Sequence, residues 1–181
     1  TFTAATATDF STQVNALVNS GVKVVFLPIY AEEASTFLTQ AKGKFAEDVY
    51  FFGGDGLDGI LGKISQDVTI ADNVLMMTPF AADSTDPKVQ AFVKAYEEAY
   101  GATPDQFAAD AYDGVHAVAE AVKEAGLGVD ADPTEAAEKL SKAMLKITVD
   151  GLTGKLTWND KGQVQKEPTA YVITDGKYVQ A

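Results

Sequence analysis

Three short and almost continuous apolar runs constrain the fold of this chain more than any other feature of its sequence. The runs are Val22–Leu27, Val49–Phe52 and Val74–Thr78, and a proline or glycine closely follows each of them. A strand that is apolar at nearly every position is typical of a parallel sheet with both faces covered. Helical spacing lies between the runs, for example around Phe37 and Leu38. We therefore predict right-handed strand–helix–strand crossovers and an α/β fold.

Beyond Asp83 the sequence changes to helical patterns. The pairs Asp86-Pro87 and Asp132-Pro133 each place a capping side chain before a proline at the first helical position. A longer helix is predicted from about Asp105 to Ala125. We expect an apolar face of this helix to point inward, formed by Phe107, Ala111, Val115, Val118 and Val122. The preceding helix is expected to bury Val89, Phe92, Val93, Tyr96 and Tyr100.

The end of the chain is predicted to be β-like. The expected strands are Lys155–Trp158, Thr169–Thr174 and Lys177–Val179, separated by turn sequences rich in Asp, Asn and Gly. The change of character near Pro79–Ser84 marks the best candidate for a passage between two lobes.

Composition excludes several classes of partner. The 181 residues include 26 acidic and 14 basic side chains, for a formal net charge of −12. A nucleic-acid backbone would be repelled by such a chain, so we expect no nucleic-acid partner. No apolar run approaches the roughly 20 residues that span a bilayer. Thr1 opens without the features of a signal peptide, so if the parent protein has a leader or a lipid anchor, we expect it to lie upstream.

Candidates for catalysis are few. There is no cysteine, and His116 is the only histidine, so neither a zinc site nor a nucleophilic site is expected. Asp110 and Asp113 flank Tyr112 on the long helix and are interpreted as a solvated face or a helix-start cluster rather than an acid/base pair. We predict that the chain is not an enzyme and needs no cofactor.

The segment Gly54-Asp55-Gly56-Leu57-Asp58-Gly59 allows three interpretations. It fits the glycine fingerprint of dinucleotide-binding folds, but Asp55 and Asp58 would oppose a pyrophosphate, and the next strand ends without an acidic residue to hold a ribose. In the second interpretation the glycines only tighten a strand-to-helix turn. In the third, Asp55 stands at the carboxyl end of a parallel strand, where it can pair with a ligand's ammonium group.

Tyr30 occupies the equivalent place after the preceding strand. If the two strands are neighbours, Tyr30 and Asp55 face one crevice from adjacent strand ends. The alternative is that Tyr30 only packs on the helix that starts at Ala31.

Several segments together resemble the branched-chain amino-acid-binding family of periplasmic proteins. They lie in order along essentially the whole chain: Asp9-Phe10-Ser11, Ser20-Gly21, Val24–Tyr30, Gln40-Ala41, Phe52–Gly56, Phe107–Asp113, Thr153-Gly154 and Trp158–Gly162. The resemblance implies a type I periplasmic binding fold, in which two three-layer α/β lobes close around a ligand. It also implies that Tyr30 and Asp55 contact the ligand, with Asp55 binding its α-amino group.

The resemblance carries further expectations about organisation. Residues 1–78 would belong to lobe 2, residues 79–165 to the mainly helical part of lobe 1, and residues 166–181 would cross back to lobe 2. Family members are about twice as long, so the fold is expected to be incomplete, with the N-terminal half absent and ligand affinity below that of the parent protein. The unpaired sheet edge is expected to bind that missing half or a second copy of the fragment.

These implications define the expected function. The chain would belong to an extracytoplasmic solute-binding protein, periplasmic or lipid-anchored, that delivers an amino acid or related amide to the membrane permease of an ABC importer. A sensory ligand-binding domain of the same fold and, on the glycines alone, a nucleotide-binding oxidoreductase are the alternatives.

Overall fold

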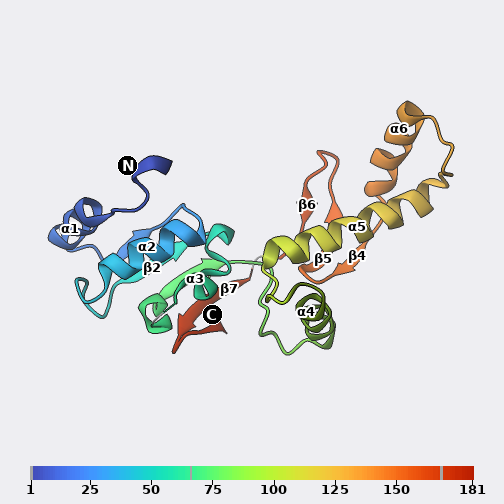
Figure 1. Cartoon of the computed structure of the whole chain (residues 1–181). Coiled ribbons are helices and arrows are strands. Elements are labelled where there is room, and N and C mark those ends of the chain that lie inside the picture. The colour runs from blue at the N-terminus through green and yellow to red at the C-terminus, as the bar shows by residue number, and fades with distance from the viewer. Residues whose placement is uncertain (1, 66, 168) are drawn as a thin grey trace. The chain divides into compact units, whose positions relative to one another are not determined.

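The computed structural model of the chain describes residues 2–65, 67–167 and 169–181, which form two compact units (Figure 1). The first unit combines the chain up to Thr78 with the C-terminal segment Thr169–Ala181, and the second consists of the chain between these parts.

The first unit contains an α/β sheet with its helices, as predicted. Its elements in chain order are η1 (Ala4–Thr6), α1 (Ser11–Ser20), β1 (Val24–Phe26), α2 (Ala31–Ala41), β2 (Tyr50–Gly53), η2 (Asp55–Leu57), α3 (Ile60–Lys63), η3 (Val68–Ala71), β3 (Val74–Met77), β7 (Ala170–Thr174) and β8 (Lys177–Gln180). Each of the three apolar runs forms a strand. Gly21 adopts the left-handed conformation that ends α1, with φ of 65°.

The sheet has the order β1-β2-β3-β7-β8. The first three strands are parallel, and their register pairs Val25 with Phe51 and Phe51 with Val74. Strand β7 joins β3 in antiparallel orientation, and β8 continues the sheet from β7. Because β1 and β2 run in the same direction in close register, their carboxyl ends open at the same edge of the sheet.

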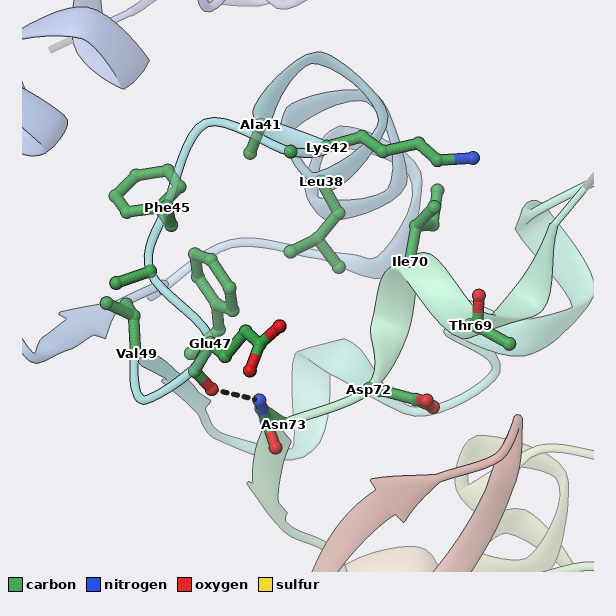
Figure 2. A pocket seen from close by; sticks show the side chains of 13 residues that line it. Leu38, Ala41, Lys42, Phe45, Glu47, Val49, Thr69, Ile70, Asp72 and Asn73 are labelled. Carbon is green, nitrogen blue, oxygen red and sulfur yellow. Dashed lines mark hydrogen bonds between the residues drawn. The ribbon is translucent and has the colours of Figure 1, made fainter.

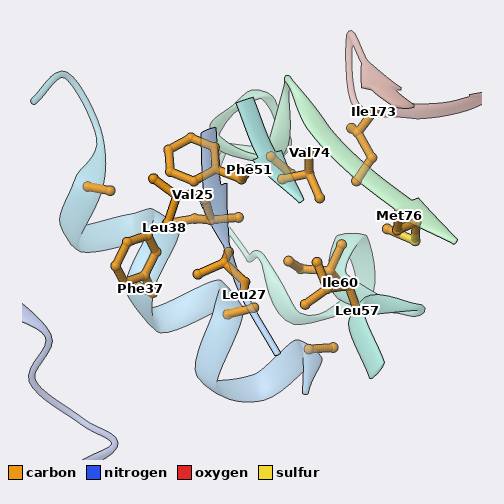
Figure 3. Packing of buried hydrophobic residues seen from close by; sticks show 14 of the residues in the cluster. Val25, Leu27, Phe37, Leu38, Phe51, Leu57, Ile60, Val74, Met76 and Ile173 are labelled. Atoms are coloured by element: carbon orange, nitrogen blue, oxygen red, sulfur yellow. The ribbon is translucent and has the colours of Figure 1, made fainter. Parts of the chain in front are cut away.

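One hydrophobic core supports this sheet (Figure 3). Val25, Phe51 and Val74 project from successive strands toward the helices, where Leu38 of α2 and Ile60 of α3 meet them. Aromatic edge-to-face contacts add to this packing, including Phe37 with Phe51 at 6.1 Å between ring centroids. The core thereby fixes the strand ends from which the loops emerge.

The second unit packs helices on a small antiparallel sheet. Its elements are α4 (Pro87–Tyr100), α5 (Gln106–Ala125), α6 (Pro133–Met144), β4 (Val149–Gly151), β5 (Gly154–Trp158) and β6 (Val164–Gln165), with sheet order β4-β5-β6. The two Asp-Pro pairs start helices as predicted. The side chains of Asp86 and Asp132 accept hydrogen bonds from backbone N–H groups in the first turns of α4 and α6. The long helix α5 contacts both α6 and β4.

The expected inward faces of α4 and α5 are wrong in part. Tyr100 is 72% exposed on α4, and Val115 is 71% exposed on α5, where Phe107, Ala111 and Val118 are exposed as well. The residues that α5 buries are Gln106, Ala109, Asp113, Ala117 and Ala121. From Ala109 on, these buried residues recur at four-residue spacing, and the small side chains of the alanines let the helix pack closely against β4.

Asp113 is also placed differently from the prediction. It is only 2% exposed, and its carboxylate accepts hydrogen bonds from the backbone N–H of Leu152 at 2.8 Å and of Thr153 at 2.9 Å. The hydroxyl of Thr153 donates a third bond at 2.8 Å. Asp113 is therefore a buried clamp on the turn between β4 and β5 rather than a solvated residue. Asp110 is exposed and pairs with Lys166.

Because the buried carboxylate of Asp113 lies against Gly151, we predict that position 151 tolerates no side chain. A Cβ at Gly151 would overlap the carboxylate of Asp113, whereas a Cβ at Gly114 on α5 would meet nothing within 4 Å. We expect Gly151→Ala to destabilise the second unit by about 1–3 kcal/mol. The control Gly114→Ala should stabilise it by about 0.5–1 kcal/mol, because alanine is the better helix former. Urea unfolding followed by the fluorescence of Trp158 measures both, and equal effects would contradict the clamp.

Candidate functional site

Tyr30 and Asp55 lie in the loops that follow two neighbouring strands. Phe26 at the end of β1 is paired with Phe52 of β2, so both loops leave the sheet at its carboxyl edge. Tyr30 is the residue before α2, with extended backbone, and Asp55 opens η2. Both side chains are exposed, Tyr30 by 66%. The condition set by the sequence, that the two strands be neighbours, is met.

Gly56 brings the two loops into direct contact. A Cβ at this position would lie 2.9 Å from the backbone carbonyl oxygen of Ile29 and 3.4 Å from Cδ1 of Tyr30. The absence of a side chain therefore lets the second loop pass beside the ring of Tyr30. This role of Gly56 was not recognised in the sequence, where it counted only as a member of the glycine motif.

The two acidic residues of the glycine motif have different environments. Asp58 is buried, and its backbone N–H donates a hydrogen bond to the carbonyl oxygen of Asp55 at 3.0 Å. The side chain of Asp55, by contrast, is exposed at the edge. Of the two, only Asp55 presents its carboxylate to a ligand arriving from solvent, where it can accept hydrogen bonds from an ammonium group.

The geometry gives no support to the dinucleotide interpretation of the same motif. Pyrophosphate sites use the amino end of a full helix directly after the glycines. Here Gly54 leads into a three-residue 3-10 helix, and Gly59, with φ of 78°, then starts the four-residue α3. With an acidic residue in that first turn, the loop is suited to a cation rather than to a phosphate.

A hollow lies at the edge of the sheet opposite to Tyr30 and Asp55, and we call it the amino-edge hollow (Figure 2). It measures about 290 Å³ and has an apolar floor that includes Leu38 and Val49. Asn73 at its mouth donates a hydrogen bond of 3.1 Å to the backbone carbonyl of Glu47, as the dashed line in Figure 2 shows. Open α/β sheets bind ligands at the carboxyl ends of their strands, so we do not assign the ligand to this hollow.

Lys42 at this hollow is hydrogen-bonded to Asp67 and lowers the pKa of its carboxyl group. Its Nζ lies 2.7 Å from Oδ2 of Asp67, and Thr69 donates to the same carboxylate from its hydroxyl and its backbone N–H. Lys42 first, and Thr69 second, lower the pKa of Asp67 from 3.8 to about 2. Because the folded pKa is depressed, the stabilisation is present above pH 3.8 and is lost as the pH falls through about 2.

We expect an NMR pH titration of the Asp67 carboxyl carbon to show a midpoint near 2. Lys42→Met should raise the midpoint toward 3.8 without reaching it, since Thr69 still donates. The control Lys63→Met removes a lysine that pairs with Glu32 instead and should leave the midpoint unchanged. An ordinary Asp67 midpoint in the unaltered chain would contradict this ion pair.

The single histidine of the sequence, His116, lies on α5 in the second unit. His116 lies against the ring of Tyr112, with centroids 4.5 Å apart. Within residues 2–65, 67–167 and 169–181, no cluster of three or more histidine, aspartate or glutamate residues could hold a metal ion. No helix in this part of the chain is long and apolar enough to cross a membrane.

Comparison with known proteins identifies the family. A family model described as periplasmic binding protein matches residues 1–177. The chain belongs to the periplasmic binding protein family. This is a family of solute-binding proteins and not of enzymes, in agreement with the prediction from the sequence.

Solved structures of the family share the fold. The isoleucine complex of a branched-chain amino acid transporter substrate-binding protein from Streptococcus pneumoniae is 26% identical, with a TM-score of 0.77, and the match covers 99% of this chain and 51% of that one. A leucine-binding protein from Thermotoga maritima is 21% identical, with a TM-score of 0.75 and coverage of 96% and 48%. The fold prediction, half of a type I periplasmic binding protein, is thus confirmed.

A third match widens the range of ligands found on this fold. An ABC-transporter solute-binding protein from R. palustris, solved with benzoate, is 19% identical, with a TM-score of 0.77 and coverage of 96% of this chain and 46% of that one. The chain therefore spans about half the length of the solved relatives that it matches.

Proposed function

We propose that this chain is part of an extracytoplasmic solute-binding protein of an ABC importer, and that it binds a small amino acid at its Tyr30–Asp55 edge. Membership of the periplasmic binding protein family supports the transport role. In this proposal residues 1–78 and 166–181 belong to one ligand-binding lobe and residues 79–165 to the other. The partners are the amino acid and the membrane permease of the transporter.

The observation that carries the ligand class is the exposed carboxylate of Asp55. It stands at the carboxyl edge of a parallel sheet, on a loop held against that of Tyr30 by the close approach at Gly56. A carboxylate recognises an ammonium group through charge-assisted hydrogen bonds, and an aromatic side chain beside it can cover apolar parts of the same ligand. An α-amino acid supplies both features, as the leucine and isoleucine named for two relatives do.

Aromatic carboxylic acids are the competing ligand class. Benzoate and 3,4-dihydroxybenzoic acid are the ligands named for two matching structures, and neither carries an ammonium group. The presence of Asp55 favours the amino acid, because the negative charge of its carboxylate would oppose the binding of an anionic ligand beside it.

The ligand class can be tested with a matched pair of compounds. Leucine and 4-methylpentanoate differ only in the ammonium group, so isothermal titration of both isolates its contribution. We expect the chain to bind leucine at least about tenfold more tightly, since a hydrogen bond to a charged group contributes about 1.5–3 kcal/mol. Asp55→Asn should abolish most of this preference.

Glu47→Gln is the control, because it removes the same charge at the opposite edge of the sheet. It should leave the preference for leucine unchanged. Equal binding of leucine and 4-methylpentanoate to the unaltered chain, or tighter binding of benzoate than of leucine, would contradict an amino-acid ligand held by Asp55.

A further inference from the structure

The amino-edge hollow lies at the other end of α2 from Tyr30 and is large enough to hold a small molecule. Tyr30 directly precedes α2 and Lys42 directly follows it, so this helix places about 16 Å between them, at about 1.5 Å per residue. The volume of the hollow, about 290 Å³, is near the lower end of the range of about 300–1,000 Å³ for ligand pockets. The hollow is therefore a separate place on the first unit from the Tyr30–Asp55 edge.

The floor of the hollow is apolar. It includes Leu38, Ala41, Val49 and Phe51, which all belong to the hydrophobic core of the first unit and are buried. Because the core holds these four side chains in place, the floor is formed before a ligand arrives. Contact with such a floor favours a ligand that carries a compact apolar group.

The side-chain donors at the rim of the hollow are turned to other groups of the chain. Nζ of Lys42 lies 2.7 Å from Oδ2 of Asp67, and the hydroxyl of Thr69 donates to Oδ1 of the same carboxylate at 2.6 Å. Asn73 donates from Nδ2 to the backbone carbonyl of Glu47 at 3.1 Å. In Figure 2 the amino group of Lys42 extends away from Glu47. An anionic ligand, which needs donors from the protein, finds these groups already engaged.

The acceptors at the rim are in the opposite situation. Figure 2 shows the carboxylate of Glu47 pointing into the hollow below Leu38. No donor in the described parts of the chain pairs with this carboxylate. Asp72, also at the rim, accepts the N–H of Gly176 through Oδ1 at 3.1 Å and adds a second negative charge. Since Asp67 balances the charge of Lys42, the rim is suited to a ligand that brings its own positively charged donors.

We propose that the amino-edge hollow is a second binding site, for a small primary amine that carries a compact apolar group and no carboxylate. The ammonium group donates hydrogen bonds to the carboxylate of Glu47, and the apolar group rests on the floor that includes Leu38 and Val49. A carboxylate on the ligand is repelled by Glu47 and Asp72. The site thus takes a different ligand from the Tyr30–Asp55 edge, and it does not depend on the proposal for that edge.

Two related compounds test the site. 3-Methylbutylamine is leucine without its carboxylate, and 3-methylbutan-1-ol replaces the ammonium group of that amine by a hydroxyl. Both are titrated into the ¹⁵N-labelled Asp55→Asn variant, in which the carboxylate at the other edge of the sheet no longer competes for the amine. We expect the amine to shift the amide signals of residues 42–49 and 69–73 and to bind at least about tenfold more tightly than the alcohol. Leucine should leave these signals unchanged.

Glu47→Gln in the same background tests the carboxylate directly. It should bring the affinity for the amine to within about threefold of that for the alcohol, because the charge-assisted hydrogen bonds are lost. The control Glu138→Gln removes the same charge from an exposed position on α6 in the second unit and should leave the preference for the amine intact. Both variants are measured at one ionic strength, so that screening is equal.

Equal affinities for the amine and the alcohol, or a preference for the amine that survives Glu47→Gln, would overturn the proposal. Shifts at residues 42–49 and 69–73 that are as large with leucine as with the amine would also overturn it, because the negative rim rejects a carboxylate. The same holds for amine-induced shifts confined to residues 29–31 and 53–57. All these measurements use the Asp55→Asn variant, so failure here leaves the proposal for leucine at the unaltered Asp55 standing.

Discussion

The parallel pairing of β1, β2 and β3 is the constraint on which the rest of the structure depends. Its register places Val25, Phe51 and Val74 side by side in one core, and the same register brings the carboxyl ends of β1 and β2 to one edge. A slip of one residue would turn the buried set of a strand to the opposite face. Core packing and the placement of the candidate ligand edge are therefore consequences of one arrangement.

Two glycines then allow neighbouring segments of the chain to lie unusually close together. Gly56 lets the loop that carries Asp55 lie against the ring of Tyr30, and Gly151 leaves room for the buried carboxylate of Asp113. In both cases the glycine leaves room for a neighbouring group that a side chain at its position would displace. The chain thus uses the same physical device at an exposed edge of the first unit and in the core of the second.

Local signals made most elements predictable, whereas features that depend on distant partners were not. The apolar runs predicted the strands, and the Asp-Pro pairs predicted the starts of two helices, because these patterns depend only on residues that are close in the sequence. The buried role of Asp113 could not be predicted, since its partners Leu152 and Thr153 lie 39 and 40 residues away. The buried face of α5 was mispredicted for the same reason, because α5 contacts β4, which lies far along the chain, and buries alanines rather than valines. The adjacency of Tyr30 and Asp55 followed from strand order, while their binding role stays a prediction.

Chemical-shift mapping on the ¹⁵N-labelled chain tests the central claim, that the carboxyl edge of β1 and β2 is the ligand side of the sheet. On addition of leucine the account predicts the largest amide changes at residues 29–31 and 53–57. Changes confined to the amino-edge hollow, at residues 42–49 and 69–73, would contradict it and place the ligand at the opposite edge of the sheet.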